Sequence, residues 1–431
     1  MKILFVIHRY WPYPGGAERY VQEMAERLVR EGHRAAVVTT DAWDVEYFFA
    51  GGRRRVDRGN ELCRGVPVTR LRARRFPFHT RACRLLSALA PVGARWRFVP
   101  PSPLVPSLGR ELERHRDADL VHFTSLPFDS LMHASFSFAR RRGIPYLITP
   151  FIHFGEPCES RGFPSRLRAI EARILRESDL VIAQTRLEKD VLARAGVDPG
   201  RVVVLGMGVN PGELRGGSGE RFRERHGISP RDTMILHVAE KTMEKGSMHL
   251  VEAARRLRAR GASVTTVLAG ASMRDFSRYL RGPGADMLDS CVLLDAVTGQ
   301  EKEDMFAASD IHAMTSKTDS YGIVYLESWL AGRPVIGAFA GGVAELIEDG
   351  EDGFLVPFGN VAMLAESLWT LIRDRGLRDR MGERGRRKVL ASCTWDRRYA
   401  VFRELLETTA RPRPVNGGGP APIERRAPDP K

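Results

Sequence analysis

The chain has 431 residues, of which 43% are hydrophobic and 28% charged, and its formal net charge is +14. This length allows two domains, and the composition is that of a soluble globular protein. No apolar run reaches the length of a membrane span. The opening residues 1–7, MKILFVI, are followed at once by His8, Arg9 and a Pro-rich turn, so we expect a buried strand there and no signal peptide.

Short apolar runs alternate with amphipathic stretches along most of the chain, which predicts parallel strands joined by helices and therefore an α/β fold. In the first half, the predicted strands are residues 2–7, 35–40, 119–123, 146–149, 180–183 and 202–205. In the second half, they are residues 234–238, 264–268, 292–294, 311–314, 335–337 and 354–356. We expect two doubly wound parallel sheets, with ligands bound between them at the carboxyl ends of the strands.

The predicted domain boundary is the Gly-rich, polar stretch 206–220, which can neither continue a helix nor pack as a strand. The first domain is then residues 1–205 and the second residues 206–393. The end of the chain, residues 411–431, consists of Pro, Gly and charged residues with almost no apolar ones, and we expect it to be disordered.

Positive charge is concentrated in residues 51–116, where Arg outnumbers acidic residues by about 12. Aromatic and Leu side chains are interleaved with these Arg residues, which suits an anionic membrane surface. A solvated Arg-rich surface is an equally good interpretation. Nucleic acid is a weaker third one, because no recognised nucleic-acid-binding module accompanies the charge, and we expect no such partner.

The cysteines are five in number, without any Cys-x-x-Cys pair: Cys63, Cys83, Cys158, Cys291 and Cys393. An odd, scattered set favours the reducing cytoplasm and indicates neither a disulfide framework nor a zinc site.

The most informative segment is residues 315–342, TSKTDSYGIVYLESWLAGRPVIGAFAGG, which contains two carboxylates, Asp319 and Glu327. Asp319 lies in a polar turn, Gly322 opens a predicted helix, and Glu327 follows about one turn later, so both acids can face one site. An ionised carboxylate accepts hydrogen bonds from neighbouring sugar hydroxyls with charge-assisted strength. The pattern therefore suits recognition of a sugar.

This segment resembles the acid-x7-Glu signature of the retaining, nucleotide-sugar-dependent glycosyltransferases of the group 1, or family 4, type, which have the GT-B fold. The resemblance implies two Rossmann-like domains, an acceptor-binding first domain and a last helix, residues 394–410, that crosses back to that domain. It further implies that Asp319 contacts the donor sugar and that Glu327 holds the ribose of the nucleotide. The family usually has Glu where this chain has Asp319.

Two features of the first domain fall after predicted strands. Gly15 and Gly16 precede a helix, where glycine allows close backbone approach and free N–H groups bind phosphate. The resemblance places Gly16 against the donor phosphates. It also implies that His153, in TPFIHFGE, lies beside the transferred sugar, although a lone His is more often structural. His8 and His122 are weaker candidates that would line the acceptor side.

The second domain begins with a segment that resembles the family's Gly-Arg and Lys-Gly pair, whose cations hold the donor diphosphate. Lys245 matches the Lys, but Glu240 stands where Arg is expected. One explanation is that Lys241 or another cation supplies the missing charge while Glu240 turns away or pairs with it. The alternative is that the donor differs or that activity is weak or lost.

A Gly-Gly turn after a later strand completes the predicted site. The resemblance implies that backbone N–H groups of Gly341, Gly342 and Val343 reach the donor. No Asp-x-Asp motif is present, so we expect no metal and no other cofactor. The sequence thus predicts a cytoplasmic hexosyltransferase, lying on the inner membrane face if the basic region binds lipid, with a lipid-linked or saccharide acceptor. The alternative is a catalytically silent relative that binds a sugar nucleotide or polysaccharide.

Overall fold

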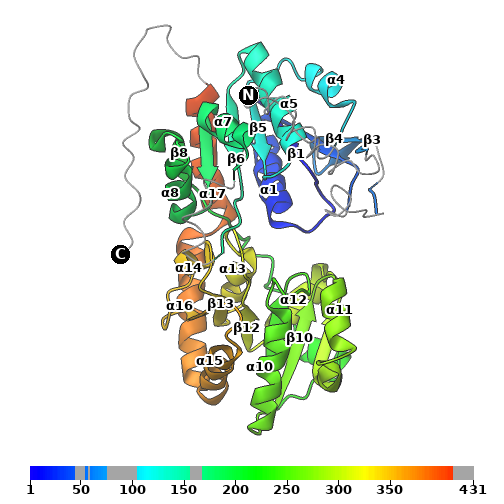
Figure 1. The fold of residues 1–431 in the computed structure, drawn as a ribbon, viewed down its shortest axis with the longest axis vertical. Coiled ribbons are helices and arrows are strands. Elements are labelled where there is room, and N and C mark those ends of the chain that lie inside the picture. The colour runs from blue at the N-terminus through cyan, green and yellow to red at the C-terminus, as the bar shows by residue number, and fades with distance from the viewer. Residues whose placement is uncertain (44–53, 57–58, 75–103, 156–166, 411–431) are drawn as a thin grey trace.

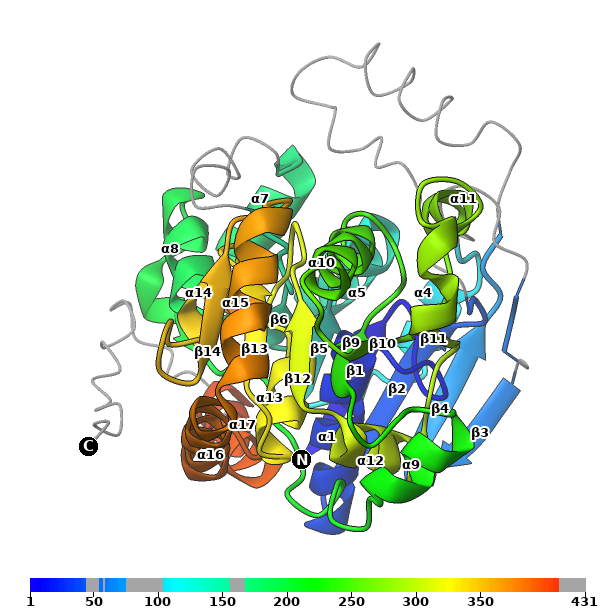
Figure 2. The same ribbon diagram turned by 90° about the horizontal axis from the view of Figure 1, so that it is seen from below.

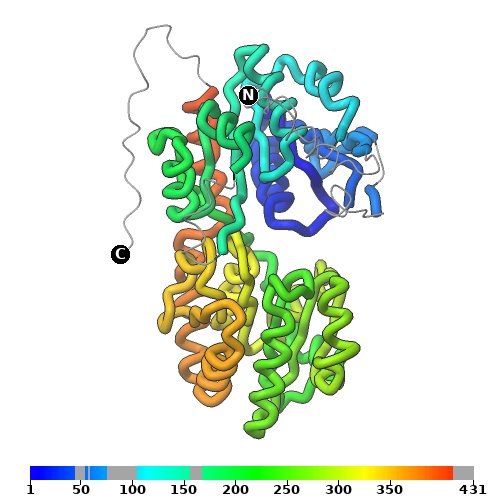
Figure 3. Tube along the Cα trace, in the orientation of Figure 1, coloured from blue at the N-terminus to red at the C-terminus, as the bar shows by residue number. Residues whose placement is uncertain are grey.

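The computed structural model describes residues 1–43, 54–56, 59–74, 104–155 and 167–410. Two lobes lie one above the other in Figure 1, and the tube in Figure 3 shows that the upper lobe is mainly the first half of the chain and the lower lobe the second. The tail predicted to be disordered, residues 411–431, lies outside the described residues. So do Cys83 and Cys158, whereas Cys63, Cys291 and Cys393 are free thiols.

The N-terminal domain is built on an eight-stranded sheet of order β3-β4-β2-β1-β5-β6-β7-β8, in which only β3 and β4 pair antiparallel. Its strands are β1 (Lys2–Ile7), β2 (Arg34–Thr40), β3 (Gly59–Cys63), β4 (Val66–Leu71), β5 (Leu120–Thr124), β6 (Tyr146–Thr149), β7 (Leu180–Ala183) and β8 (Val202–Val204). Its described helices are α1 (Gly16–Arg30), α4 (Leu108–Glu113), α5 (Asp129–Arg142), α7 (Ala169–Glu177), α8 (Arg186–Arg194) and the short η3 (Pro199–Arg201).

The C-terminal domain is built on a six-stranded parallel sheet of order β11-β10-β9-β12-β13-β14. Its strands are β9 (Thr233–Val238), β10 (Val264–Ala269), β11 (Cys291–Leu294), β12 (Ile311–Met314), β13 (Val335–Ala338) and β14 (Gly353–Val356). Its helices are α9 (Gly219–Arg225), α10 (Ser247–Ala259), α11 (Arg274–Leu280), η4 (Ala285–Ser290), α12 (Gly299–Ala308), α13 (Ile323–Leu330), α14 (Val343–Leu346), α15 (Val361–Arg373) and α16 (Arg375–Ser392). Viewed from below in Figure 2, helices cover both faces of this sheet.

Every strand predicted from the sequence is present, with ends that agree to within about one residue, so the prediction of two parallel sheets is confirmed. The prediction missed the β3–β4 hairpin. The alternating buried positions of β4 are Val66, Val68 and Arg70. Arg70 is 4% exposed and pairs with Glu61 on β3. A buried arginine therefore occupies a position where an apolar residue would have signalled a strand.

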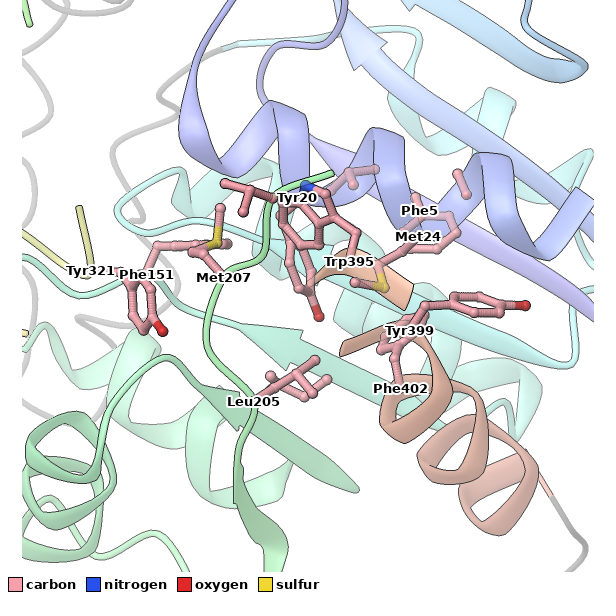
Figure 4. Close-up of a cluster of buried hydrophobic side chains, with 14 of the residues drawn as sticks. Phe5, Tyr20, Met24, Phe151, Leu205, Met207, Tyr321, Trp395, Tyr399 and Phe402 are labelled. Carbon is pink, nitrogen blue, oxygen red and sulfur yellow. The ribbon is translucent and has the colours of Figure 1, made fainter. Parts of the chain in front are cut away.

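The last helix, α17 (Trp395–Ala410), returns to the N-terminal domain. The interdomain linker meets its start through two hydrogen bonds, Val209 N–H to the Cys393 carbonyl (3.0 Å) and Trp395 N–H to the Val209 carbonyl (3.1 Å). Phe402 then packs against Phe5 and Tyr20, with ring centroids 6.5 and 6.2 Å away (Figure 4). The helix therefore binds the first domain by buried aromatic contact.

Among the described residues, no helix is both long and apolar enough to cross a membrane.

Replacing Phe402 with Ala should destabilise the protein by about 3–5 kcal/mol, because its fully buried ring would leave a cavity between α17 and the first domain. Urea denaturation followed by fluorescence would measure the change. Val401, which is 42% exposed on the same helix, provides the control, and its replacement by Ala should cost less than about 0.5 kcal/mol. Equal effects of the two substitutions would show that α17 is not packed as described.

Candidate functional site

The loop after β6 pairs with the C-terminal domain through its backbone. Asp319 N–H donates to the Phe154 carbonyl at 3.2 Å, and Gly341 N–H donates to the Gly155 carbonyl at 2.9 Å. Gly341 has φ +53°, and a Cβ on it would lie 2.2 Å from the Asp319 carbonyl oxygen, so only glycine fits this close approach. The carboxyl ends of β6, β12 and β13 are thereby brought together between the two domains.

Lys245 and Asp319 form an ion pair at this junction, with Nζ and Oδ2 3.3 Å apart. Lys245 belongs to the turn between β9 and α10, whose last residue, Gly246, has φ +78° and lies so close to the Thr315 carbonyl that a Cβ would be 2.5 Å from it. This close packing holds the turn against the end of β12. The structure therefore brings together two residues that the sequence predicted for one site.

His153 lies in the same place, and its electrostatic environment couples it to this pair. Its side chain is exposed, but desolvation by the surrounding protein lowers its pKa. The positive charge of Lys245 lowers the pKa further, and the negative charge of Asp319 raises it. For Asp319, burial disfavours the ionised form, but Lys245, His153 and hydrogen bonds from Lys245 and the Tyr321 amide together outweigh burial and lower its pKa. Asp319 is thus held as a carboxylate.

Glu327 makes a second ion pair, which the sequence did not predict. Its Oε1 accepts a 2.6 Å hydrogen bond from Nζ of Lys302 on α12, and the Glu327 side chain is 10% exposed. Lys302 stands in a helix without a motif, so only the folded structure shows this partner. Each of the two signature acids therefore forms an ion pair with a lysine.

The predicted glycine positions differ in how they are used. Gly16 is the first residue of α1, and a Cβ on it would meet only Met207, at 3.9 Å. In the β13–α14 turn, Gly341 N–H is engaged by Gly155, and Gly342 N–H points to the Asp319 carbonyl at 3.4 Å. Val343 begins α14 with a buried side chain. Part of this predicted donor-binding turn is therefore already used to join the domains.

Lys241 does not join this group, contrary to what the sequence suggested. It is only 1% exposed, and its ammonium group donates to the Gly270 carbonyl and, at 2.5 Å, to the Leu294 carbonyl. It therefore binds the ends of β10 and β11. Burial lowers its pKa, and Asp295 opposes this effect. Its ammonium group is therefore not available to replace the Arg that was expected beside the diphosphate.

Glu240, at the position of the expected Arg, is exposed and faces the other domain. Tyr13, in the loop between β1 and α1, donates a long 3.5 Å hydrogen bond to Glu240 Oε1. The guanidinium of Arg9 lies 3.6 Å from the centre of the Tyr13 ring. The carboxylate of Glu240 is thus directed toward the N-terminal domain and its Arg9, and it does not pair with Lys241.

The two weaker candidates, His8 and His122, are both buried. His122 accepts or donates a 2.8 Å hydrogen bond with Thr149 Oγ1, and burial lowers its pKa to about 3. His8 stacks on Phe128 with ring centroids 3.7 Å apart. His122 lies within β5, and His8, just after β1, also has its Nε2 3.4 Å from Glu18 Oε1. Both side chains are thus engaged inside the first domain.

Glu188, on α8, anchors the loop that carries His153. Its two carboxylate oxygens accept hydrogen bonds from Ile152 N–H at 2.9 Å and from Gln184 N–H at 2.6 Å. Burial raises its pKa from 4.5 to about 7, the two N–H groups oppose this, and the nearby Glu345 reinforces it. Glu188 was not predicted from the sequence as a site residue, because a Glu within an amphipathic helix normally faces solvent.

The described residues contain no group of three or more His, Cys, Asp or Glu side chains that could hold a metal ion.

Two glycosyltransferase family models match successive parts of the chain: a glycosyl transferase 4-like domain over residues 15–208 and glycosyl transferases group 1 over residues 218–388. The chain belongs to the group 1 glycosyltransferases. A D-inositol 3-phosphate glycosyltransferase of Salinispora arenicola is 30% identical over 54% of this chain and 56% of its own length. The chain thus spans about half the length of the first curated relatives that it matches. An uncharacterized glycosyltransferase of Methanocaldococcus jannaschii, MJ1607, is 24% identical over 92% of this chain and 95% of its own length.

Solved structures of this class show the same architecture. Anabaena Alr3699/HepE in complex with UDP-glucose superposes with a TM-score of 0.71 at 19% identity, covering 95% of this chain and 100% of that one. Sucrose-phosphate synthase from Thermosynechococcus elongatus also has a TM-score of 0.71, at 17% identity, covering 95% and 99%. These likenesses and the two facing parallel sheets give this glycosyltransferase family member the GT-B fold.

The raised pKa of Glu188 predicts a pH-dependent stability. Between pH 4.5 and about 7 the folded protein keeps a proton that the unfolded chain has lost, so the contribution of Glu188 is greatest at low pH and falls as pH rises toward 7. Glu188→Gln removes this titration. Its melting temperature relative to the natural protein should therefore rise between about pH 5 and pH 8.

Differential scanning calorimetry across this pH range would measure the effect. Asp190→Asn, at an exposed position on the same helix, is the control and should show no such trend. A difference between Glu188→Gln and the natural protein that is the same at both ends of the range would contradict the assigned environment.

Proposed function

We propose that the chain is a retaining glycosyltransferase that moves a hexosyl group from a nucleoside diphosphate sugar to a lipid-linked or saccharide acceptor. The observation that supports this most directly is the Lys245–Asp319 pair, formed where the two domains meet and accompanied by His153 from the first domain. One cation and one carboxylate side by side suit a substrate that carries phosphates next to hydroxyl groups.

Each residue then has a distinct role. Lys245 would neutralise the charge that develops on the departing diphosphate, which is an electrostatic stabilisation of the transition state. Asp319, kept ionised by its surroundings, would accept hydrogen bonds from the sugar hydroxyls. Glu327 would bind the ribose hydroxyls, with Lys302 holding its carboxylate in place. His153 would contact the face of the transferred sugar.

A retaining transfer of this kind needs no separate base on the protein. An oxygen of the departing diphosphate can take the proton of the acceptor hydroxyl while the new glycosidic bond forms on the same face of the sugar. The exclusion of water between the domains would prevent hydrolysis of the donor. In this proposal the positive charge comes from lysine side chains, and no metal ion is required.

The acceptor is proposed to lie against the N-terminal domain, in envelope polysaccharide or glycolipid synthesis at the cytoplasmic face of the membrane. The basic region 51–116 motivates this, but much of it lies outside the described residues. Several of its described cations are already paired, among them Arg55 with Asp41 and Arg114 with Glu111. These pairs favour the interpretation of a structural, Arg-rich surface over that of a membrane-binding one.

A second candidate is a silent relative that binds a sugar nucleotide without turning it over. The exposed carboxylate of Glu240 near the expected diphosphate position is the observation that favours it. Incubation with UDP-, GDP- and ADP-sugars separates the two proposals. A transferase releases the nucleoside diphosphate, with or without EDTA, whereas a silent binder protects the donor from release.

Lys245→Ala should lower kcat/KM by about 100- to 1,000-fold, equivalent to about 2–4 kcal/mol of lost transition-state stabilisation. Steady-state rates of nucleotide release with the active donor would test this. Lys317→Ala, which removes an exposed lysine from the neighbouring β12–α13 loop, should leave the rate nearly unchanged. Similar rates for Lys245→Ala and the natural protein would remove Lys245 from the proposed chemistry.

Glu240→Gln should leave kcat/KM unchanged or raise it, because the substitution removes negative charge near the donor and keeps the shape of the side chain. The measurement is the same nucleotide-release assay, with the Kd for UDP as a second readout. If Glu240→Gln abolishes turnover while the melting temperature is preserved, Glu240 must take part in the reaction itself.

A further inference from the structure

An arginine-lined cavity of about 220 Å3 lies in the C-terminal domain, away from the candidate site. Thr233, Asp310 and Pro334 line it, and they stand at or just before the first residues of β9, β12 and β13. The candidate site is at the opposite, carboxyl ends of these strands. The cavity therefore belongs to a separate surface of the domain.

Five arginines contribute to its lining: Arg223, Arg231, Arg333, Arg375 and Arg378. Two of them have structural roles. Arg223 donates to the carbonyls of Ser229, Asp232 and Ala308, and Arg378 donates to those of Leu371 and Ile372. Arg231 is exposed, and Arg375, whose side chain is 84% exposed, is 3.8 Å from Asp379. The latter two keep donors directed to solvent or to a ligand.

Arg333 is the most informative of the five. One of its terminal nitrogens donates to the Ala307 carbonyl at 2.8 Å, but its Nε is buried and finds no partner among the described residues. Burial lowers the pKa of Arg333. The carboxylates of Asp310 and Asp379 raise this pKa, and the positive charges of Arg223 and Arg378 lower it. A buried donor of this kind calls for an acceptor.

Three acidic side chains also line the cavity, and two of them are occupied by other donors. Asp310 accepts from Arg223 and, at 2.8 Å, from Met234 N–H. Asp232 accepts from the hydroxyls of Ser263 and Thr265, both at 2.6 Å. The arginines that line the cavity also outnumber its aspartates, so positive charge exceeds negative charge there.

We propose that this cavity binds a compact anion carrying a phosphate group, either free in solution or as a lipid headgroup. The guanidinium group presents its donors in a planar fork that matches phosphate oxygens, and several such groups around one cavity favour a multivalent anion. The guanidinium groups of Arg333, Arg231 and Arg375 supply the donors. This inference is independent of the proposed transfer reaction.

Titration calorimetry of the full chain with inorganic phosphate tests the proposal. We expect saturable binding that is weakened by about tenfold or more in Arg333→Gln and in Arg375→Gln. Because Arg375 is exposed, its substitution should not disturb folding. Arg386→Gln, on the same helix but outside the cavity, should bind phosphate as the natural protein does.

Two further arms identify the source and the site. If flotation with phosphatidylglycerol vesicles depends on Arg375 and free phosphate does not bind, the ligand is a lipid headgroup. Lys245→Gln should keep phosphate binding, since Lys245 is in the interdomain site. Loss of binding in Lys245→Gln with retention in both arginine variants would overturn the proposal, as would the absence of binding to both phosphate and vesicles.

Discussion

Two backbone hydrogen bonds between the domains, from Asp319 N–H to Phe154 and from Gly341 N–H to Gly155, determine the geometry of the candidate site. The residue before His153 is fixed as well, because Ile152 N–H donates to the buried carboxylate of Glu188. His153 is therefore held on both sides by its backbone while its side chain stays exposed. Its position relative to Asp319 follows from these anchors. The contact of Gly341 requires glycine, and the contact of Ile152 requires the Glu188 carboxylate.

The same anchors constrain how the domains can move. Glu345, one turn beyond Gly341, accepts hydrogen bonds from Arg186 N–H at 2.9 Å and from Leu187 N–H at the start of α8. At the other side of the molecule, the linker and α17 join through Val209 and Trp395. A change in the angle between the domains must either break the contacts around Phe154 or carry the whole loop with the C-terminal domain.

The strands could be predicted because each is a short apolar run that two layers of helices bury, and this pattern is local. The sequence could predict that Lys245 and Asp319 belong to one site, because both stand in motifs near glycines that a tight turn requires. The partners of Glu327, Glu240 and Lys241 could not be predicted from the sequence. Lys302, Tyr13 and the Leu294 carbonyl lie on other elements, and only the packing of those elements determines which side chain meets which. Lys241 shows this most clearly, since its charge alone suggested a role that its burial does not support.

In the proposed transfer reaction, the two ion pairs would allow a site with few cations to receive a diphosphate. A buried carboxylate without a partner would be costly, and Lys245 keeps Asp319 ionised before any substrate arrives. A diphosphate that approached Lys245 would replace one negative partner with another, so the ammonium group would lose little, while Asp319 would gain hydroxyl donors from the sugar. In the same proposal, Glu327 would exchange Lys302 for the ribose hydroxyls. The site then needs no additional arginine at position 240, provided that the carboxylate there stays directed toward Tyr13.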